Sequence, residues 1–124
     1  MTPNFKKEEF TCKCGCGFND IDLGLVNRLQ VVRDIARIPI RIRSACRCTK
    51  HNADVGGAIE GYHPKGKAVD WDFYESEINS LGMTLLEKIC TKLLDNWSGG
   101  FHYYPTNEKG IEFCHCDVGP RRRW

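Results

Sequence analysis

The stretch that decides the fold is His63-Pro64-Lys65-Gly66-Lys67-Ala68-Val69-Asp70-Trp71-Asp72-Phe73. Its second part, residues 67–73, carries β-branched, aromatic and small apolar side chains, which are typical of a β-strand. Gly66 permits the bend that a chain needs to enter such a strand from a loop. We therefore expect a loop and a strand that together bring His63 and Asp70 to one point.

Upstream of this stretch, the sequence predicts a helix followed by a strand. In residues 21–38, apolar side chains recur at steps of four, three and four, so that one helical face can be buried. Asn19 or Asp20 can cap the start of this helix, and Pro39 ends it. Residues 40–45 begin with alternating Ile and Arg, which indicates a strand with one buried face.

Downstream, the pattern predicts one more helix and two more strands. Residues 48–66 are rich in glycine and predict a loop, whereas residues 82–96 carry an apolar helical stripe. Residues 101–104 and 111–118 predict short strands. Two main helices and about four strands, not in strict β-α-β order, indicate an α+β fold with a small, mainly antiparallel sheet. We expect residues 1–124 to form a single domain.

The composition narrows the class of protein. A chain of 124 residues that is 41% hydrophobic and 27% charged is typical of one domain with its own core. A net charge of +2 gives no electrostatic case for nucleic acid, and the run Arg121-Arg122-Arg123 is interpreted as a solvated end. No segment reaches the roughly 18 apolar residues of a membrane span, and residues 1–9 lack a signal-peptide core. We expect a monomer made in the cytoplasm, without nucleic-acid partners or membrane insertion.

Two imidazoles and one carboxylate suggest a metal site. His63 and Asp70 flank the loop that enters a strand, and His115 lies on the last predicted strand. Such a set leaves one position of a tetrahedral zinc ion open for water, as in catalytic zinc sites. The spacing alone also fits an ordinary polar His and a solvated Asp.

Several motifs in order resemble a known family. Ser44-Ala45-Cys46-Arg47-Cys48, His51-Asn52, Val55-Gly56-Gly57-Ala58 and the run from His63 to Asp70 are similar to the S-G-Y-R-C, H-N, V-G-G-A and S-x-H-x-x-G-x-A-x-D motifs of the M15 zinc D-Ala-D-Ala peptidases. Residues 113–119 resemble the F-V-H-V-D-V segment of that family, and residues 9–17 resemble the opening of one M15 subgroup. This chain has Ala45-Cys46 where the family often has Gly-Tyr, and Gly61 where it often has Ser.

The resemblance implies a Hedgehog/DD-peptidase fold in which His63, Asp70 and His115 bind one catalytic Zn²⁺. It also implies hydrolysis of an amide bond in peptidoglycan stem peptides or cross-links, by a D-Ala-D-Ala carboxypeptidase or an endolysin-type endopeptidase. Such an enzyme acts at the bacterial cell wall after release from the cell or as part of a phage virion. The alternative is a metal-containing module that binds peptidoglycan or protein without turnover.

Amide hydrolysis at an open zinc also needs a base, and two carboxylates compete for that role. Glu112 stands three residues before His115, where the family commonly carries an acid, and we favour it on that pattern. Strand parity instead places Asp117 near the metal, where it can also orient a ligand His. The resemblance assigns Arg47 to binding of the substrate or the developing oxyanion, which suits a guanidinium.

The eight cysteines need a separate interpretation. By strand parity, Cys114 and Cys116 should lie on the opposite face of the strand from the zinc. Cys90 is expected in the core. Disulfides, a second, structural zinc bound by thiolates, and reduced buried cysteines all remain open. The partners considered for Cys114 and Cys116 are Cys46, Cys48 and the group Cys12-Cys14-Cys16.

Overall fold

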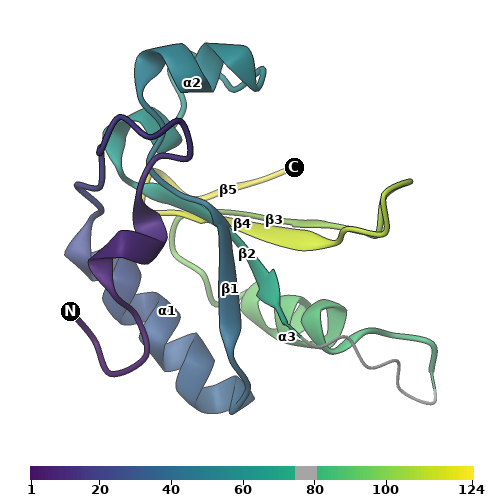
Figure 1. The fold of residues 1–124 in the computed structure, drawn as a ribbon. Coiled ribbons are helices and arrows are strands. Elements are labelled where there is room, and N and C mark those ends of the chain that lie inside the picture. Colours follow the sequence, from purple (N-terminus) through teal and green to yellow (C-terminus); the bar gives the residue numbers. More distant parts are fainter. Residues whose placement is uncertain (75–80) are drawn as a thin grey trace.

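A five-stranded sheet forms the centre of the molecule (Figure 1). The structure, a computed structural model, describes residues 1–74 and 81–124. The strand order is β1-β2-β4-β3-β5, and neighbours are antiparallel except for the parallel pair β3 and β5. This confirms the predicted α+β class with a mainly antiparallel sheet. The strands are Ile40–Ser44 (β1), Ala68–Phe73 (β2), Gly100–Tyr104 (β3), Phe113–Asp117 (β4) and Arg122–Arg123 (β5).

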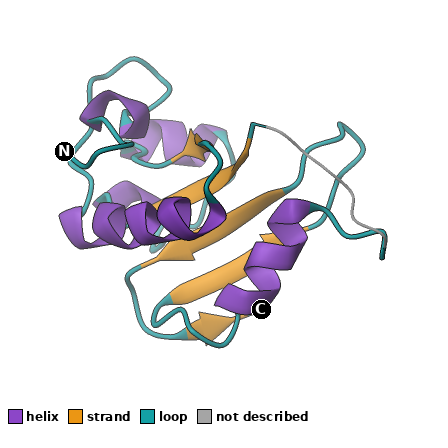
Figure 2. Ribbon diagram, turned by 90° about the horizontal axis from the view of Figure 1, so that it is seen from below, coloured by secondary structure: helices purple, strands orange, loops and turns teal. Residues whose placement is uncertain are grey.

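The helices lie on both sides of the sheet. Helices α1 (Leu23–Ala36) and α3 (Leu85–Leu93) cover one face together, as Figure 2 shows. Helix α2 (Thr49–Asp54) lies beyond the opposite face (Figure 1). Two 3₁₀ turns, η1 (Lys7–Phe10) and η2 (His63–Lys65), complete the elements.

None of the helices in residues 1–74 and 81–124 combines the length and the apolarity that crossing a bilayer requires.

The start of α1 differs from the prediction. The side chain of Asp22 caps the helix, because its Oδ1 accepts a hydrogen bond of 2.9 Å from the backbone N–H of Leu25. The prediction of Asn19 or Asp20 as the cap is therefore wrong. The physical reason is tertiary: the backbone N–H of Asp22 donates to the carbonyl of Gly66 across 2.7 Å, and the helix begins only after this contact.

The two long helices bury the faces that the periodicity predicted. Helix α1 ends at its cap residue Arg37, whose φ of 61° is left-handed, two residues before Pro39. Both helices are shorter than the predicted ranges 21–38 and 82–96 because capping residues, Asp22 and Thr84, begin them. On the apolar stripes, Leu25, Leu29, Val32 and Ile89 are buried, whereas Ala36, Leu85 and Leu93 are half-buried against the core.

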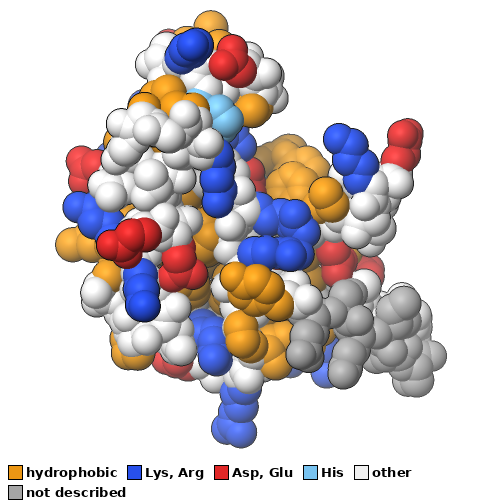
Figure 3. All heavy atoms as spheres, in the orientation of Figure 1, with side chains coloured by type: hydrophobic (Ala, Val, Ile, Leu, Met, Phe, Trp, Pro, Cys, Tyr) orange, Lys and Arg blue, Asp and Glu red, His pale blue; other side chains and the backbone are white. Residues whose placement is uncertain are grey.

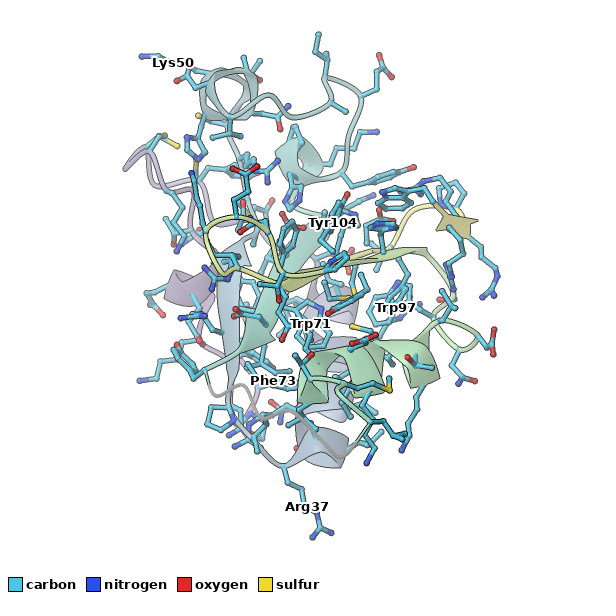
Figure 4. The ribbon with its side chains drawn as sticks, turned by 90° about the vertical axis from the view of Figure 1, so that its right-hand side faces the viewer. Arg37, Lys50, Trp71, Phe73, Trp97 and Tyr104 are labelled. Carbon is cyan, nitrogen blue, oxygen red and sulfur yellow. The ribbon has the colours of Figure 1, made fainter. Side chains whose placement is uncertain are left out.

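The sheet has one apolar face and one polar face. In Figure 4, Trp71, Phe73 and Trp97 lie on the side of α1 and α3, whereas Tyr104 lies on the opposite side, toward α2. Side chains alternate along a strand, so the residues next to Trp71 and Phe73 on β2 project from the opposite face, into the space under α2. The polar face is therefore where functional side chains can gather.

The sequence predicts neither helix α2 nor strand β5. Helix α2 lies inside residues 48–66, which the glycine content predicted as a loop. Strand β5 pairs with β3 in parallel, so the interpretation of Arg121-Arg122-Arg123 as a solvated end is wrong. Arg122 and Arg123 are half-buried, because the tail pairs with Gly100 and Phe101 of β3, 22 residues earlier in the chain. Such long-range pairing leaves no local signal.

Candidate metal centre

His63, Asp70 and His115 converge on the polar face of the sheet. Asp70 of β2 and His115 of β4 are direct partners across the two strands, so their side chains project from the same face. His63 comes from η2, after which Gly66 turns the chain into β2 with a left-handed φ of 67°. Nδ1 of His115 lies 3.0 Å from Oδ1 of Asp70, and Nε2 of His63 lies 3.3 Å from Oδ2.

These three side chains fit one divalent ion. One donor atom from each lies within 4.8 Å of the other two. Zinc bonds of roughly 2.0–2.2 Å to nitrogen and oxygen place two ligands of a tetrahedral ion about 3.4 Å apart, close to both carboxylate–imidazole separations. Three protein ligands leave the fourth position free, as in catalytic zinc sites. The donor set therefore suits an open zinc site.

Each imidazole is oriented by a second hydrogen bond. Nδ1 of His63 donates to the carbonyl oxygen of Ala45 across 2.7 Å, which directs Nε2 toward Asp70. Nε2 of His115 donates to Oδ2 of Asp117 across 2.8 Å, which directs Nδ1 toward Asp70. Outer partners of this kind fix the ring orientation and the tautomer of metal-binding histidines.

The electrostatics favour positive charge at this point. Burial opposes ionisation of Asp70, but hydrogen bonds with His115 and His63 outweigh it and hold the pKa of this carboxyl well below its usual range. Burial also opposes protonation of His115, but hydrogen bonds with Asp117 and Asp70 raise the pKa of its imidazole to about 9. Two carboxylates thus stabilise a positive charge between them, and a divalent cation can replace that proton.

Arg47 lies directly beside the metal group, by which we mean His63, Asp70 and His115. Its Nη2 donates to Oδ2 of Asp70 across 3.2 Å, its Nε to Oγ of Ser44 across 2.9 Å, and its Nη1 to Oδ1 of Asn52 across 3.4 Å. Only 15% of the Arg47 side chain is exposed. The sequence-predicted guanidinium is therefore held in place at the metal group and lines its pocket.

A pocket of about 410 Å³ contains the metal group. Figure 3 shows the corresponding hollow between the α2 part of the molecule and the tip of the β3–β4 hairpin. The sequence did not predict Tyr62, Arg122 or Trp124 as part of a site, because the chain ends and loops that carry them meet only in the fold. The larger side chains that line the pocket are Arg47, Tyr62, Tyr104, Phe113, Arg122 and Trp124.

Asp117 lies behind His115 with no exposed surface. Its Oδ1 accepts from the backbone N–H groups of Gly100 and Gly119 at 2.9 and 3.0 Å, and its Oδ2 accepts from His115 and Arg122. Both oxygens are therefore engaged. This geometry fits the expectation that Asp117 orients a ligand His.

Glu112 lies on the other face of the sheet. Its Oε2 accepts hydrogen bonds from the hydroxyls of Tyr103, at 2.6 Å, and Thr84, at 2.8 Å. Thr84 is the cap of α3, which packs on the apolar face. The structure thus does not bring Glu112 to the pocket, and its role as the base stays a prediction. To act there, the carboxylate must leave Tyr103 and Thr84.

Four further residues on or near the polar face differ in their contacts. Asp72, one strand step from Asp70, forms ion pairs with Arg41 at 2.7 Å and Arg43 at 2.8 Å. Tyr104 lines the pocket, whereas His51 does not. His102 stacks on the ring of Trp124 with a centroid separation of 5.2 Å.

The cysteines of β4 lie on the face opposite the metal group, as strand parity predicted. Cys114 and Cys116 are fully buried in the core, with 3.9 Å between their sulfurs, and Cys90 is buried there as well. All eight cysteines are free. Cys48 lies with the N-terminal cysteines instead of these core cysteines.

A comparison with protein-family models gives the relationship of this chain. The model for peptidase M15 matches residues 3–103, most of the chain. The chain belongs to the peptidase M15 family. The residues matched by the family model include His63 and Asp70 but end before His115. In the folded M15 peptidase, His115 lies with these two residues in the metal group. A search of curated proteins found no match.

Proposed function

We propose that this M15 peptidase is a zinc enzyme that hydrolyses an amide bond in peptidoglycan stem peptides or their cross-links. The observation that carries the proposal is the convergence of His63, Asp70 and His115 in an open pocket, with both imidazoles oriented by outer partners. When bound, zinc supplies an acidified water and a polarised carbonyl for amide hydrolysis.

The protein side chains around this group have distinct tasks in the proposed reaction. Arg47 binds the peptide carboxylate or the developing oxyanion, because its guanidinium is already fixed by Ser44 and Asn52. The aromatic rings of Tyr62, Tyr104 and Trp124 form pocket walls on which a short peptide can pack. Both features suit a small, anionic peptide such as a wall stem peptide.

The place of action follows from this substrate. Stem peptides and cross-links belong to the bacterial wall, so the proposed enzyme reaches them after release from the cell or as part of a virion. The proposed enzyme is a monomer that needs neither nucleic acid nor a membrane. On the face shown in Figure 3, basic and acidic side chains are interspersed, which offers no broad basic surface there.

The test is digestion of purified peptidoglycan by the zinc-loaded protein, with mass spectrometry of the released fragments. The fragment masses identify the bond that is cut. His63→Ala should release nothing, whereas the control His51→Ala, which removes an imidazole outside the metal group and the pocket, should cleave like the wild type. Walls of several chemotypes that release no fragment would overturn the proposal.

A metal-containing binding module without turnover is the second candidate. The observation in its favour is that neither carboxylate offers a free oxygen to the pocket: Asp117 is fully engaged, and Glu112 faces α3. In that case the wild-type protein should sediment with peptidoglycan without cutting it. His63→Ala should weaken this sedimentation.

A further inference from the structure

Four cysteines outside the pocket form a second cluster of metal-binding atoms. Cys12, Cys14, Cys16 and Cys48 each place a sulfur within 4.8 Å of the other three. The Sγ atoms of Cys12 and Cys14 lie 3.5 Å apart, as do those of Cys14 and Cys48. Three of these residues come from one N-terminal loop, and the fourth is the cap of α2.

The loop backbone explains why three alternate cysteines face one point. Gly15 and Gly17 adopt left-handed φ values of 86° and 87°, which only glycine accepts without strain. The backbone N–H of Cys12 donates to the carbonyl of Phe18 across 2.7 Å and closes the loop on itself. The loop therefore wraps around its own sulfurs.

The sulfur positions match a tetrahedral thiolate site. A disulfide requires about 2.05 Å between sulfurs, whereas Zn–S bonds of about 2.3 Å place the sulfurs of a tetrahedral site about 3.8 Å apart. The separations of 3.5 Å lie close to the second value. Four such ligands close the coordination sphere, which is the property of a structural zinc site.

Backbone donors support the sulfurs from outside. The N–H of Cys48 donates to Sγ of Cys12, and the N–H of His51 donates to Sγ of Cys48, both across 3.4 Å. Hydrogen bonds to ligand atoms orient metal ligands and tune their basicity. The other four cysteines, in contrast, are buried in the apolar core: Cys46, Cys90, Cys114 and Cys116.

We propose that Cys12, Cys14, Cys16 and Cys48 bind one Zn²⁺ as a closed structural site, separate from the open site at His63, Asp70 and His115.

This second ion ties the N-terminal loop to the wall of the pocket. The backbone N–H of Cys46 donates to the carbonyl of Phe10 in the N-terminal segment. Cys48 is a ligand of the proposed ion. Arg47 lies between these two cysteines in the chain and is therefore held from both sides. The backbone N–H of Arg47 in turn donates to the carbonyl of His63 across 3.2 Å. The thiolate site thus positions Arg47 next to the open metal group.

The test is the number of zinc ions per chain after purification under reducing conditions, measured by elemental analysis. The wild type should hold two, one for each cluster. The double variant C14S/C16S alters the two exposed cysteines and should lose one ion, and H63A should lose the other. The control C90A should keep both, because Cys90 belongs to neither cluster. These counts do not depend on peptide hydrolysis, so they stand apart from the proposed function.

Cobalt substitution provides a measurement that does not depend on the folding of a cysteine variant. Cobalt-loaded wild type and H63A should both show the near-ultraviolet charge-transfer band of thiolate-bound cobalt. The proposal would be overturned if the cobalt-loaded wild type lacked this band. It would also be overturned if the wild type held only one zinc ion and C14S/C16S still held it. In a second preparation, purified without a reductant, mass spectrometry of the denatured chain should find all eight cysteines as free thiols. A mass two hydrogens lower for each disulfide would also overturn the proposal.

Discussion

Asp117 and His115 are joined by a hydrogen bond of 2.8 Å from Nε2 of the imidazole to Oδ2 of the carboxylate. Asp117 is itself held by the backbone N–H groups of Gly100 and Gly119 and by Arg122. Because the acceptor cannot move, the ring of His115 presents Nδ1 to Asp70. A residue with no exposed surface thereby controls the orientation of a candidate ligand in the pocket.

Asp117→Asn should weaken zinc binding at the open site by roughly 10- to 100-fold, which is the usual effect of losing an outer partner of a ligand His. Competition with a chromophoric chelator measures the affinity. Asp72→Asn is the matched control, because Asp72 pairs with Arg41 and Arg43 and touches no member of the metal group. Equal affinities for Asp117→Asn and wild type would contradict the assigned role.

Arg47→Lys should lower kcat/KM for wall peptides by roughly 10- to 100-fold, since a charge-assisted hydrogen bond contributes about 1.5–3 kcal/mol and a point charge cannot replace the fork of a guanidinium. The zinc content should stay at the wild-type level. The control is Arg43→Lys, which changes a guanidinium paired with Asp72 outside the pocket. A Lys variant that cleaves at the wild-type rate would remove Arg47 from substrate binding.

Glu112→Gln should abolish wall cleavage with zinc content unchanged if Glu112 is the base, as we predict from the family pattern; a lost base costs roughly 10²- to 10⁴-fold in rate. Tyr103→Phe is the control, because it removes one hydrogen bond to Glu112 but leaves the carboxylate. Tyr103→Phe should therefore keep cleavage. Full activity of Glu112→Gln would instead confine Glu112 to anchoring the cap of α3 through Thr84.

Arg122→Ala should lower the free energy of unfolding by about 1 kcal/mol, because a buried carboxylate loses one charged donor while the arginine itself is 38% exposed. Urea titration measures this change. When Asp117 is already Asn, Arg122→Ala should lower the free energy of unfolding much less, because both substitutions remove the same Arg122–Asp117 ion pair. Additive losses in the double variant would show that Arg122 acts through other contacts.

Local sequence patterns were sufficient for the main elements. The spacing of Leu25, Leu29 and Val32 predicted the buried face of α1, and the alternation at the start of residues 40–45 predicted β1. Both patterns work because burial repeats with the period of the helix or strand itself. Element boundaries were less accurate, since Asp22 becomes the cap only through its contact with Gly66.

The sequence alone predicted the candidate ligands His63, Asp70 and His115, through its resemblance to the M15 motifs. It also predicted the face on which Cys114 and Cys116 lie, because strand parity is a local property. Only the tertiary structure decided which distant groups meet: Cys48 with the N-terminal cysteines, Arg122 with Asp117, and Glu112 with Tyr103 and Thr84. The contacting residues are between 5 positions apart in the chain, for Asp117 and Arg122, and 36 positions apart, for Cys12 and Cys48. Their geometry depends on how the strands pair and how the loops pack, and no local pattern in the chain records it.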